Sequence, residues 1–244
     1  MAPADPFSDA VFTRAHPRFT ARADHEVLSG MEERRMWHAA RRRTDTPGEQ
    51  PRPSKAAQAP PQHGQPALLI VDMISRFDFP GGAHLAAAAL PVAERIAQVR
   101  ARFHRRGWPV LFANDNFADW RTDFEGLWAL CADPAQRGAQ IAACLAPHPQ
   151  DYYVLKPKHS AFLGSALALL LARLQTTHLL VTGIATDACV LATAIDARMR
   201  DFQVQVPPSC CAALDDGRQQ RALRLLREAF AVRISERLPA RTRG

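Results

Sequence analysis

The sequence predicts a doubly wound, three-layer α/β/α fold with a mostly parallel sheet of five or six strands. From residue 66 onward, short continuous apolar runs alternate with longer stretches of helical periodicity. Apolar runs of this kind are typical of strands that are buried on both faces. Strand and helix alternate five or six times, which is the pattern of a parallel sheet covered by helices on both sides.

The expected elements follow one another in a regular order. Strands are predicted at residues 67–71, 110–113, 152–155, 178–182 and 202–206, with an edge strand at 232–234. Helices are predicted at residues 86–106, 133–145, 163–175, 187–200 and 215–230. Gly107 follows the first helix, where a left-handed cap residue is usual. The longest apolar run, residues 165–172, is too short to span a bilayer.

The composition of the chain changes near residue 65. Residues 1–65 are rich in Pro, Gln, Ser and Arg, which predicts an N-terminal arm and a proline-rich linker that are largely disordered. A short amphipathic helix within residues 25–43 is either a loosely attached appendage or a partner-binding arm. We expect the α/β domain to cover residues 66–238 and a tail to cover 239–244.

Charge and cysteine content limit the partners and the cellular compartment that we expect. Hydrophobic residues make up 47% and charged residues 23% of the chain, as in ordinary globular proteins. The net charge of +7 comes mostly from scattered arginines, so we do not expect a nucleic-acid partner. The five cysteines include no CxxC pair, and the N-terminus has no signal-peptide pattern. These features favour reduced thiols and a cytoplasmic protein that does not contact a membrane.

Three polar residues follow predicted strands, at the edge where parallel α/β sheets bind ligands. Asp72 follows the first strand, Lys158 follows the third, and Cys189 lies in the first turn of the helix after the fourth. Each has a plainer interpretation: Asp72 as a turn cap, Lys158 as a solvated lysine, and Cys189 as an inert core residue. Lys156 competes with Lys158, but inside the strand we expect it to point elsewhere in the sheet.

The position of Cys189 suits a nucleophile. Backbone N–H groups at a helix start lower the pKa of a thiol and can hold an oxyanion. A thiol, a proton acceptor and a cation are together what acyl transfer needs. No GxGxxG follows the first strand and no GxxxxGK[ST] occurs, so the usual signatures of dinucleotide and nucleotide-triphosphate binding are missing.

The motifs ALLIVDM, KPKHSAF and VTGIATDACVLATAIDA resemble those of the isochorismatase-like cysteine hydrolases, over about residues 66–234. This family includes nicotinamidases, N-carbamoylsarcosine amidase, ureidoacrylate amidohydrolase and isochorismatase. The resemblance implies that Asp72, Lys158 and Cys189 form an Asp-Lys-Cys triad. It also implies a cis peptide at Ile184–Ala185, an oxyanion hole made by the N–H groups of Ala185 and Cys189, and a homodimer or homotetramer.

The activity implied by this resemblance is cleavage of a C–N bond in a small amide, carbamoyl or ureide substrate through a cysteine thioester. Isochorismate-type hydrolysis of a vinyl ether, which needs the acid but no thiol, is an alternative. A non-catalytic binding protein on the same scaffold is a third, less favoured reading.

The segment after the second strand, VLFANDNFADWRTDFEGLW, contains no histidine, whereas nicotinamidases of this family carry an Asp and several His there. His104 lies on the preceding helix, and His84 and His148 stand alone, so we predict no metal and no cofactor. Arg76 and Arg121 are candidates to clamp a substrate carboxylate. The plainer alternatives are a solvated loop after the second strand and core packing for Phe162. The predicted substrate-binding residues are Arg76, Asn114, Asn116, Trp120, Arg121 and Phe162.

Overall fold

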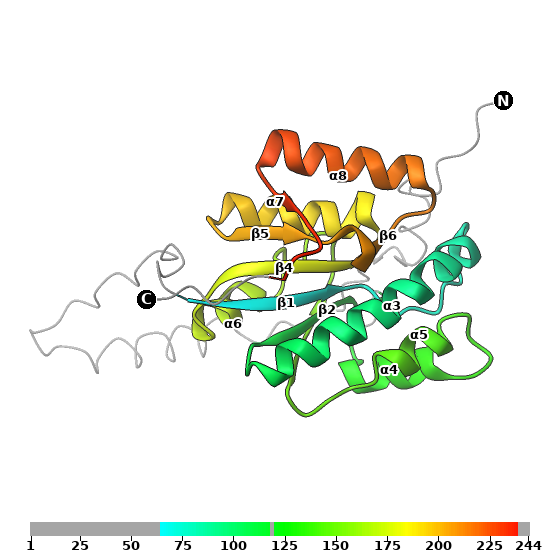
Figure 1. The fold of residues 1–244 in the computed structure, drawn as a ribbon. Coiled ribbons are helices and arrows are strands. Elements are labelled where there is room, and N and C mark those ends of the chain that lie inside the picture. Colours follow the sequence, from blue (N-terminus) through cyan, green and yellow to red (C-terminus); the bar gives the residue numbers. More distant parts are fainter. Residues whose placement is uncertain (1–63, 118–119, 239–244) are drawn as a thin grey trace, which may run out of the picture. The chain divides into compact units, whose positions relative to one another are not determined.

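A computed structural model describes residues 64–117 and 120–238 of the 244-residue chain (Figure 1). The predicted arm and linker, the helix considered within residues 25–43 and the C-terminal tail lie outside the described residues. Within the described ranges, no helix is long and apolar enough to cross a membrane.

The described residues form one seven-stranded sheet in which every pairing is parallel. Its strands are β1 (Gln65–Val71), β2 (Val110–Asp115), β3 (Asp151–Lys156), β4 (Thr176–Ile184), β5 (Gln203–Val206), β6 (Cys211–Ala212) and β7 (Arg233–Ile234). The order across the sheet is β3-β2-β1-β4-β5-β7, and β6 pairs with the end of β4. This arrangement confirms the doubly wound class. The additional strand is β6, which is too short to leave a periodic signal in the sequence.

Helices cover both faces of the sheet (Figure 1). They are α3 (Gly82–Arg105), α4 (Phe124–Ala132), α5 (Ala139–Cys144), α6 (Leu167–Arg173), α7 (Leu191–Met199) and α8 (Asp216–Phe230). Alternate residues of β1 point to opposite faces, as the pleat of a strand requires. Leu68 and Ile70 pack with α3, α4 and α5, whereas Ala67 and Leu69 pack with α6, α7 and α8.

The helix boundaries differ from the prediction in the region after β2. Helix α4 lies between the strand predicted at 110–113 and the helix predicted at 133–145, where no helix is predicted. The carboxylate of Asp123 caps α4 by accepting from the N–H of Gly126 at 2.8 Å. Asp133 follows α4 as its C-terminal cap and does not open the next helix. Its carboxylate accepts from the N–H of Ala135, a local turn that delays α5 until residue 139.

The order of the strands reverses between β1 and β4, and in sheets of this class ligands bind beyond the carboxyl ends of the strands at that point. Gly183 on β4 pairs with Val71 on β1 and has a φ of +112°. A Cβ atom at residue 183 would lie 2.0 Å from the carbonyl oxygen of Val71. Glycine therefore allows the two strands to meet just before Asp72 and Cys189.

Candidate active site

A buried ion pair joins the carboxyl ends of β1 and β3. Lys156, the last residue of β3, places its Nζ atom 2.7 Å from Oδ2 of Asp72, which directly follows β1. The other carboxylate oxygen of Asp72 accepts from the N–H of Asp115 at 2.7 Å. The side chain of Lys156 is fully buried, and its Nζ also donates to the carbonyl of Lys158 at 3.0 Å. These contacts hold the carboxylate and the ammonium in fixed positions.

The lysine at this site is Lys156, and the choice of Lys158 in the sequence analysis was wrong. Lys158 is exposed, and its backbone carbonyl is the atom that meets the Lys156 ammonium. Strand β3 continues to residue 156, one residue further than predicted, so Lys156 itself stands at the strand end. Pro157 then leads the chain away from the sheet, and Lys158 follows it toward solvent.

Cys189 lies beside this ion pair. It belongs to a π-helical turn, Thr186–Val190, that connects β4 to α7, as expected for a residue at a helix start after the fourth strand. Its Sγ atom is 3.6 Å from Nζ of Lys156. The Ile184–Ala185 peptide bond is cis, as the family resemblance implied. The thiol, the ammonium and the carboxylate thus form one cluster at the carboxyl edge of the sheet.

The charges of the cluster decide the resting protonation states. Burial, and next the negative charge of Asp72, raise the pKa of the Cys189 thiol well above its ordinary value, although Lys156 acts in the opposite direction. Burial lowers the pKa of Lys156, but the charges of Asp72 and Cys189 outweigh it and raise that pKa overall. The shifts therefore favour the charged ammonium of Lys156 and disfavour the thiolate of Cys189. Forming a thiolate at this site requires a base.

Two further side chains lie at the cluster: His159, which was not identified from the sequence, and Asp115, which belongs to the segment after the second strand that was expected to line the pocket. His159 places Nδ1 3.4 Å from Sγ of Cys189. Asp115, the last residue of β2, accepts from the N–H of Phe117 at 2.6 Å, and burial followed by the charge of Asp72 raises its pKa. A signal was available for both, because each lies at or just beyond the carboxyl end of a predicted strand.

Two of the predicted substrate-binding residues, Asn114 and Phe162, have buried side chains that contact other parts of the fold. The buried side chain of Asn114 accepts from the N–H of Ile74 at 3.0 Å and donates to the carbonyl of Ile74 at 2.8 Å. Asn114 therefore supports the segment that follows Asp72, and these contacts occupy its buried amide. Phe162 is buried in the core, where its ring centroid lies 6.0 Å from that of Phe202. For Phe162 the core-packing alternative holds.

For the remaining predicted pocket residues, the role of substrate contact remains a prediction. Arg76 forms an ion pair with Asp78 at 2.9 Å, so Asp78 competes with a substrate carboxylate for its guanidinium. Trp120 and Arg121 are exposed, and the side chain of Asn116 is buried. The proposed oxyanion-hole role of the N–H groups of Ala185 and Cys189 is a prediction as well.

In the part of the chain that the structure describes, potential metal ligands gather away from Cys189. In the described part of the chain, the one group of three His, Cys, Asp or Glu side chains close enough to share an ion lies elsewhere, at His104, His148 and Asp151. That group stands at the opposite edge of the sheet, since Asp151 begins β3 and Lys156 ends it.

Comparison with known proteins decides the family. The isochorismatase domain model matches residues 66–237, which is more than half of the chain. The chain belongs to the isochorismatase family. This isochorismatase-family chain is 36% identical over 169 residues to the isochorismatase family protein YaaI of Bacillus subtilis, a match that covers 69% of this chain and 92% of YaaI.

Two named amide-cleaving enzymes are more distant relatives of this isochorismatase-family protein. Maleamate amidohydrolase of Pseudomonas putida is 28% identical over 152 residues, covering 60% of this chain and 71% of that enzyme. The crystal structure of nicotinamidase/pyrazinamidase PncA from Bacillus subtilis is similar with a TM-score of 0.56 and 25% identity, covering 70% of this chain and 100% of that structure. The protein is a hydrolase of this family.

Proposed function

We propose that this isochorismatase-family hydrolase cleaves the C–N bond of a small amide, carbamoyl or ureide substrate, with Cys189 as its nucleophile. The observation that carries the proposal is the cluster of three functional groups. The ammonium of Lys156 lies 2.7 Å from the carboxylate of Asp72 and 3.6 Å from the thiol of Cys189. The amidohydrolase and nicotinamidase relatives support the bond type. The catalytic lysine in this proposal is Lys156, in place of Lys158.

The first half of the reaction forms a thioester. Asp72 takes the proton from the thiol of Cys189 as Sγ attacks the carbonyl carbon of the substrate. The ammonium of Lys156 stabilises the thiolate as it forms, and the N–H groups of Ala185 and Cys189 receive the oxyanion. Protonated Asp72 then gives its proton to the leaving nitrogen, and the C–N bond breaks with release of ammonia or an amine.

The second half of the reaction uses the same groups in the reverse order. Asp72, again a carboxylate, takes a proton from a water molecule that attacks the thioester carbon. The C–S bond breaks, the acid product leaves, and the proton returns to Sγ of Cys189. Lys156 remains charged throughout, because its neighbours hold its pKa above the ordinary value for lysine.

A substrate panel tests the proposal. The full chain is assayed for ammonia release from small amides, carbamoyl compounds and ureides, with Cys189→Ala as the blank and Lys158→Ala as the matched lysine control. We expect hydrolysis that Cys189→Ala and Asp72→Ala both abolish and that Lys158→Ala retains. Hydroxylamine is expected to trap the acyl group as a hydroxamate when Cys189 is present.

Two outcomes of the panel contradict the proposal. If Cys189→Ala retains turnover while Asp72→Ala loses it, the reaction does not use the thiol, as in vinyl-ether hydrolysis. If no substrate turns over and Cys189 fails to react with a small electrophile at any pH at which the protein stays folded, the scaffold binds without catalysis. A homodimer or homotetramer, the assembly that the resemblance implies, is checked by light scattering on the same preparation.

A further inference from the structure

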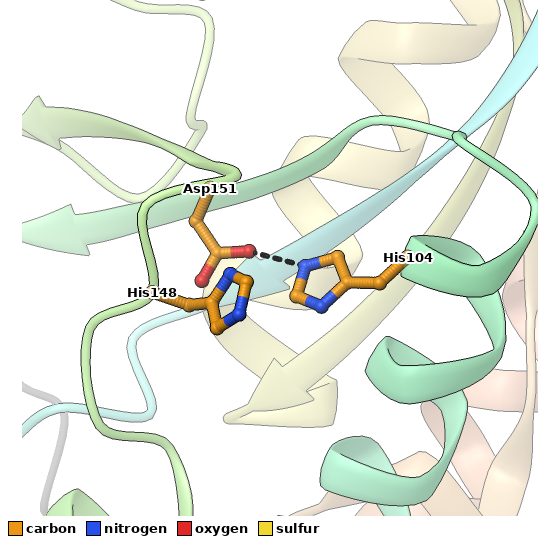
Figure 2. Close-up of side chains that lie close together, drawn as sticks. All are labelled: His104, His148 and Asp151. Carbon is orange, nitrogen blue, oxygen red and sulfur yellow. Dashed lines mark hydrogen bonds and ion pairs between the residues drawn. The ribbon is translucent and has the colours of Figure 1, made fainter.

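Three potential metal ligands converge at the edge of the sheet opposite Cys189 (Figure 2). His104 lies in the last turn of α3, His148 in the turn before β3, and Asp151 is the first residue of β3. Nε2 of His104 is 2.8 Å from Oδ1 of Asp151, and the two imidazole centroids are 4.5 Å apart. One ligand atom from each residue lies within 4.8 Å of the others. His148, which stands alone in the sequence, thus has a histidine and a carboxylate beside it.

We propose that His104, His148 and Asp151 bind one zinc ion, with water in the fourth position. Two imidazoles and a carboxylate are a donor set that zinc accepts, and three protein ligands leave one position open. Oxygen-preferring ions such as magnesium and calcium are disfavoured, because imidazole nitrogens suit zinc and its transition-metal neighbours. The sequence-based prediction of no metal set His104 and His148 aside as separate residues, whereas the fold brings both of them together with Asp151.

Neighbouring groups orient the carboxylate of Asp151 as a zinc ligand requires. The side chain of Asp151 is fully buried, and Arg100 contacts its Oδ2 atom, which leaves Oδ1 facing His104. The same guanidinium donates to the carbonyl of Ala146 at 2.8 Å, so Arg100 is itself anchored. Partners that orient a metal ligand from behind are a regular part of zinc sites. The positive charge of Arg100 opposes the cation, so we expect weaker binding than at a site without it.

Contacts around His148 select its coordinating nitrogen. Nδ1 of His148 accepts from the N–H of Gln150 at 3.2 Å, so Nε2 is the nitrogen that can meet an ion. The hydroxyl of Tyr153 accepts from the N–H of His148 at 2.9 Å and donates to its carbonyl at 3.1 Å. These contacts hold the backbone of the turn, while the exposed imidazole can still rotate.

The distance between His104 and Asp151 has to increase slightly when zinc binds. Tetrahedral zinc with bonds of about 2.0–2.1 Å separates its ligand atoms by roughly 3.4 Å. The 2.8 Å contact between Nε2 and Oδ1 therefore opens by about 0.6 Å. The imidazole of His104 can move this far, because it stands at the end of α3 and is partly exposed.

The position of the site assigns zinc a structural role. Asp151 and Lys156 stand at opposite ends of β3, and five residue steps along a strand span roughly 17 Å. An ion at Asp151 is too far away to touch a substrate at Cys189. It would join the end of α3 to the start of β3, so we expect zinc to raise Tm and leave the activity of the folded enzyme unchanged.

Zinc retention by the full chain tests the proposal. The parent protein carries Cys189→Ser, so that the active-site thiol does not bind the ion. After treatment with a chelator, loading with zinc and desalting, we expect about one zinc per chain, with a tetrahedral cobalt spectrum on substitution. In this background, His148→Gln and His104→Gln are expected to weaken binding at least about tenfold and to remove the rise in Tm. His84→Gln is the matched control, an exposed histidine on α3 outside the cluster.

Each alternative result overturns the proposal. If the parent retains no zinc and shows no rise in Tm, the cluster is a hydrogen-bonded network and not a metal site. If His148→Gln retains as much zinc as the parent, the ion binds elsewhere in the chain. Because His148 is exposed, its replacement leaves the fold intact, and circular dichroism of the variant verifies this. None of these results depends on the proposed hydrolase reaction.

Discussion

The ammonium of Lys156 lies 2.7 Å from the carboxylate of Asp72, although β2 separates the two strands that carry them. The long side chain of Lys156 bridges this gap, and its complete burial makes the ion pair strong and costly to break. Lys158 is only two residues away and has no side-chain part in the cluster. The two lysines therefore offer a matched pair of substitutions.

Replacing Lys156 with methionine is expected to lower kcat by at least about 100-fold, because the oxyanion and the thiolate lose their nearest cation. Asp72 and Asp115 also lose their shared countercharge, so the free energy of unfolding falls by about 3–5 kcal/mol. Lys158→Met is expected to change neither quantity appreciably. Steady-state kinetics and urea unfolding of the two variants check this, and greater damage from Lys158→Met would contradict the assignment.

The thiol of Cys189 is expected to react slowly with iodoacetamide at neutral pH and faster as the pH rises. The cause is the raised pKa of Cys189, to which burial and the charge of Asp72 contribute. Asp72→Asn removes that charge, so the pKa of the thiol falls and its alkylation at neutral pH accelerates. Mass spectrometry of the peptide that contains Cys189 measures both rates. Slower alkylation in Asp72→Asn would mean that Asp72 promotes the thiolate of the resting enzyme.

The folded protein is expected to lose stability above about pH 9. Burial raises the pKa values of Cys131 and Cys210 to about 11. Their folded-state pKa values lie above the unfolded value, so their contribution is complete below about pH 9 and is lost as the pH rises toward 11. The loss is on the order of 2–3 kcal/mol for each thiol. Urea unfolding at neutral and alkaline pH checks this, and a Cys131→Ala/Cys210→Ala double variant should show a flatter pH dependence.

Gly183→Ala is expected to destabilise the protein by at least about 2 kcal/mol and to reduce activity. A Cβ atom at this position meets the carbonyl oxygen of Val71 at 2.0 Å, which forces β1 and β4 apart next to Asp72. Gly107→Ala is the control, because Gly107 also has a positive φ but nothing lies within 4 Å of its added Cβ. We expect it to cost about 1–2 kcal/mol and to leave activity unchanged. Equal effects of the two substitutions would exclude the clash as the cause.

Asn114→Leu is expected to lower the free energy of unfolding by about 2–4 kcal/mol, because it leaves the N–H and C=O groups of Ile74 buried without their partners. Asn114→Asp keeps the acceptor for the N–H of Ile74 and loses the donor. Urea unfolding and steady-state kinetics separate the two possible roles of Asn114. A raised KM in both variants with unchanged stability would restore Asn114 as a substrate contact.

The sequence alone determined the fold class and two members of the proposed catalytic cluster. Alternation of buried strands with amphipathic helices is a local pattern, and it specifies a parallel sheet before any contact is known. Asp72 and Cys189 follow β1 and β4 directly, so their place at the carboxyl edge follows from the order of elements. The family resemblance added their expected chemistry.

Only the tertiary structure decided which lysine joins them. The choice between Lys156 and Lys158 depends on where β3 stops pairing with β2, and that is a property of two strands and not of one segment. The side chain of Asn114 turned toward Ile74 for a similar reason, since its partners are 40 residues away in the chain. His104 lies 47 residues from Asp151, and the packing of α3 against the sheet brings them together. Local periodicity carries no information about such long-range contacts, because it records which face of an element is buried and not which distant residue covers it.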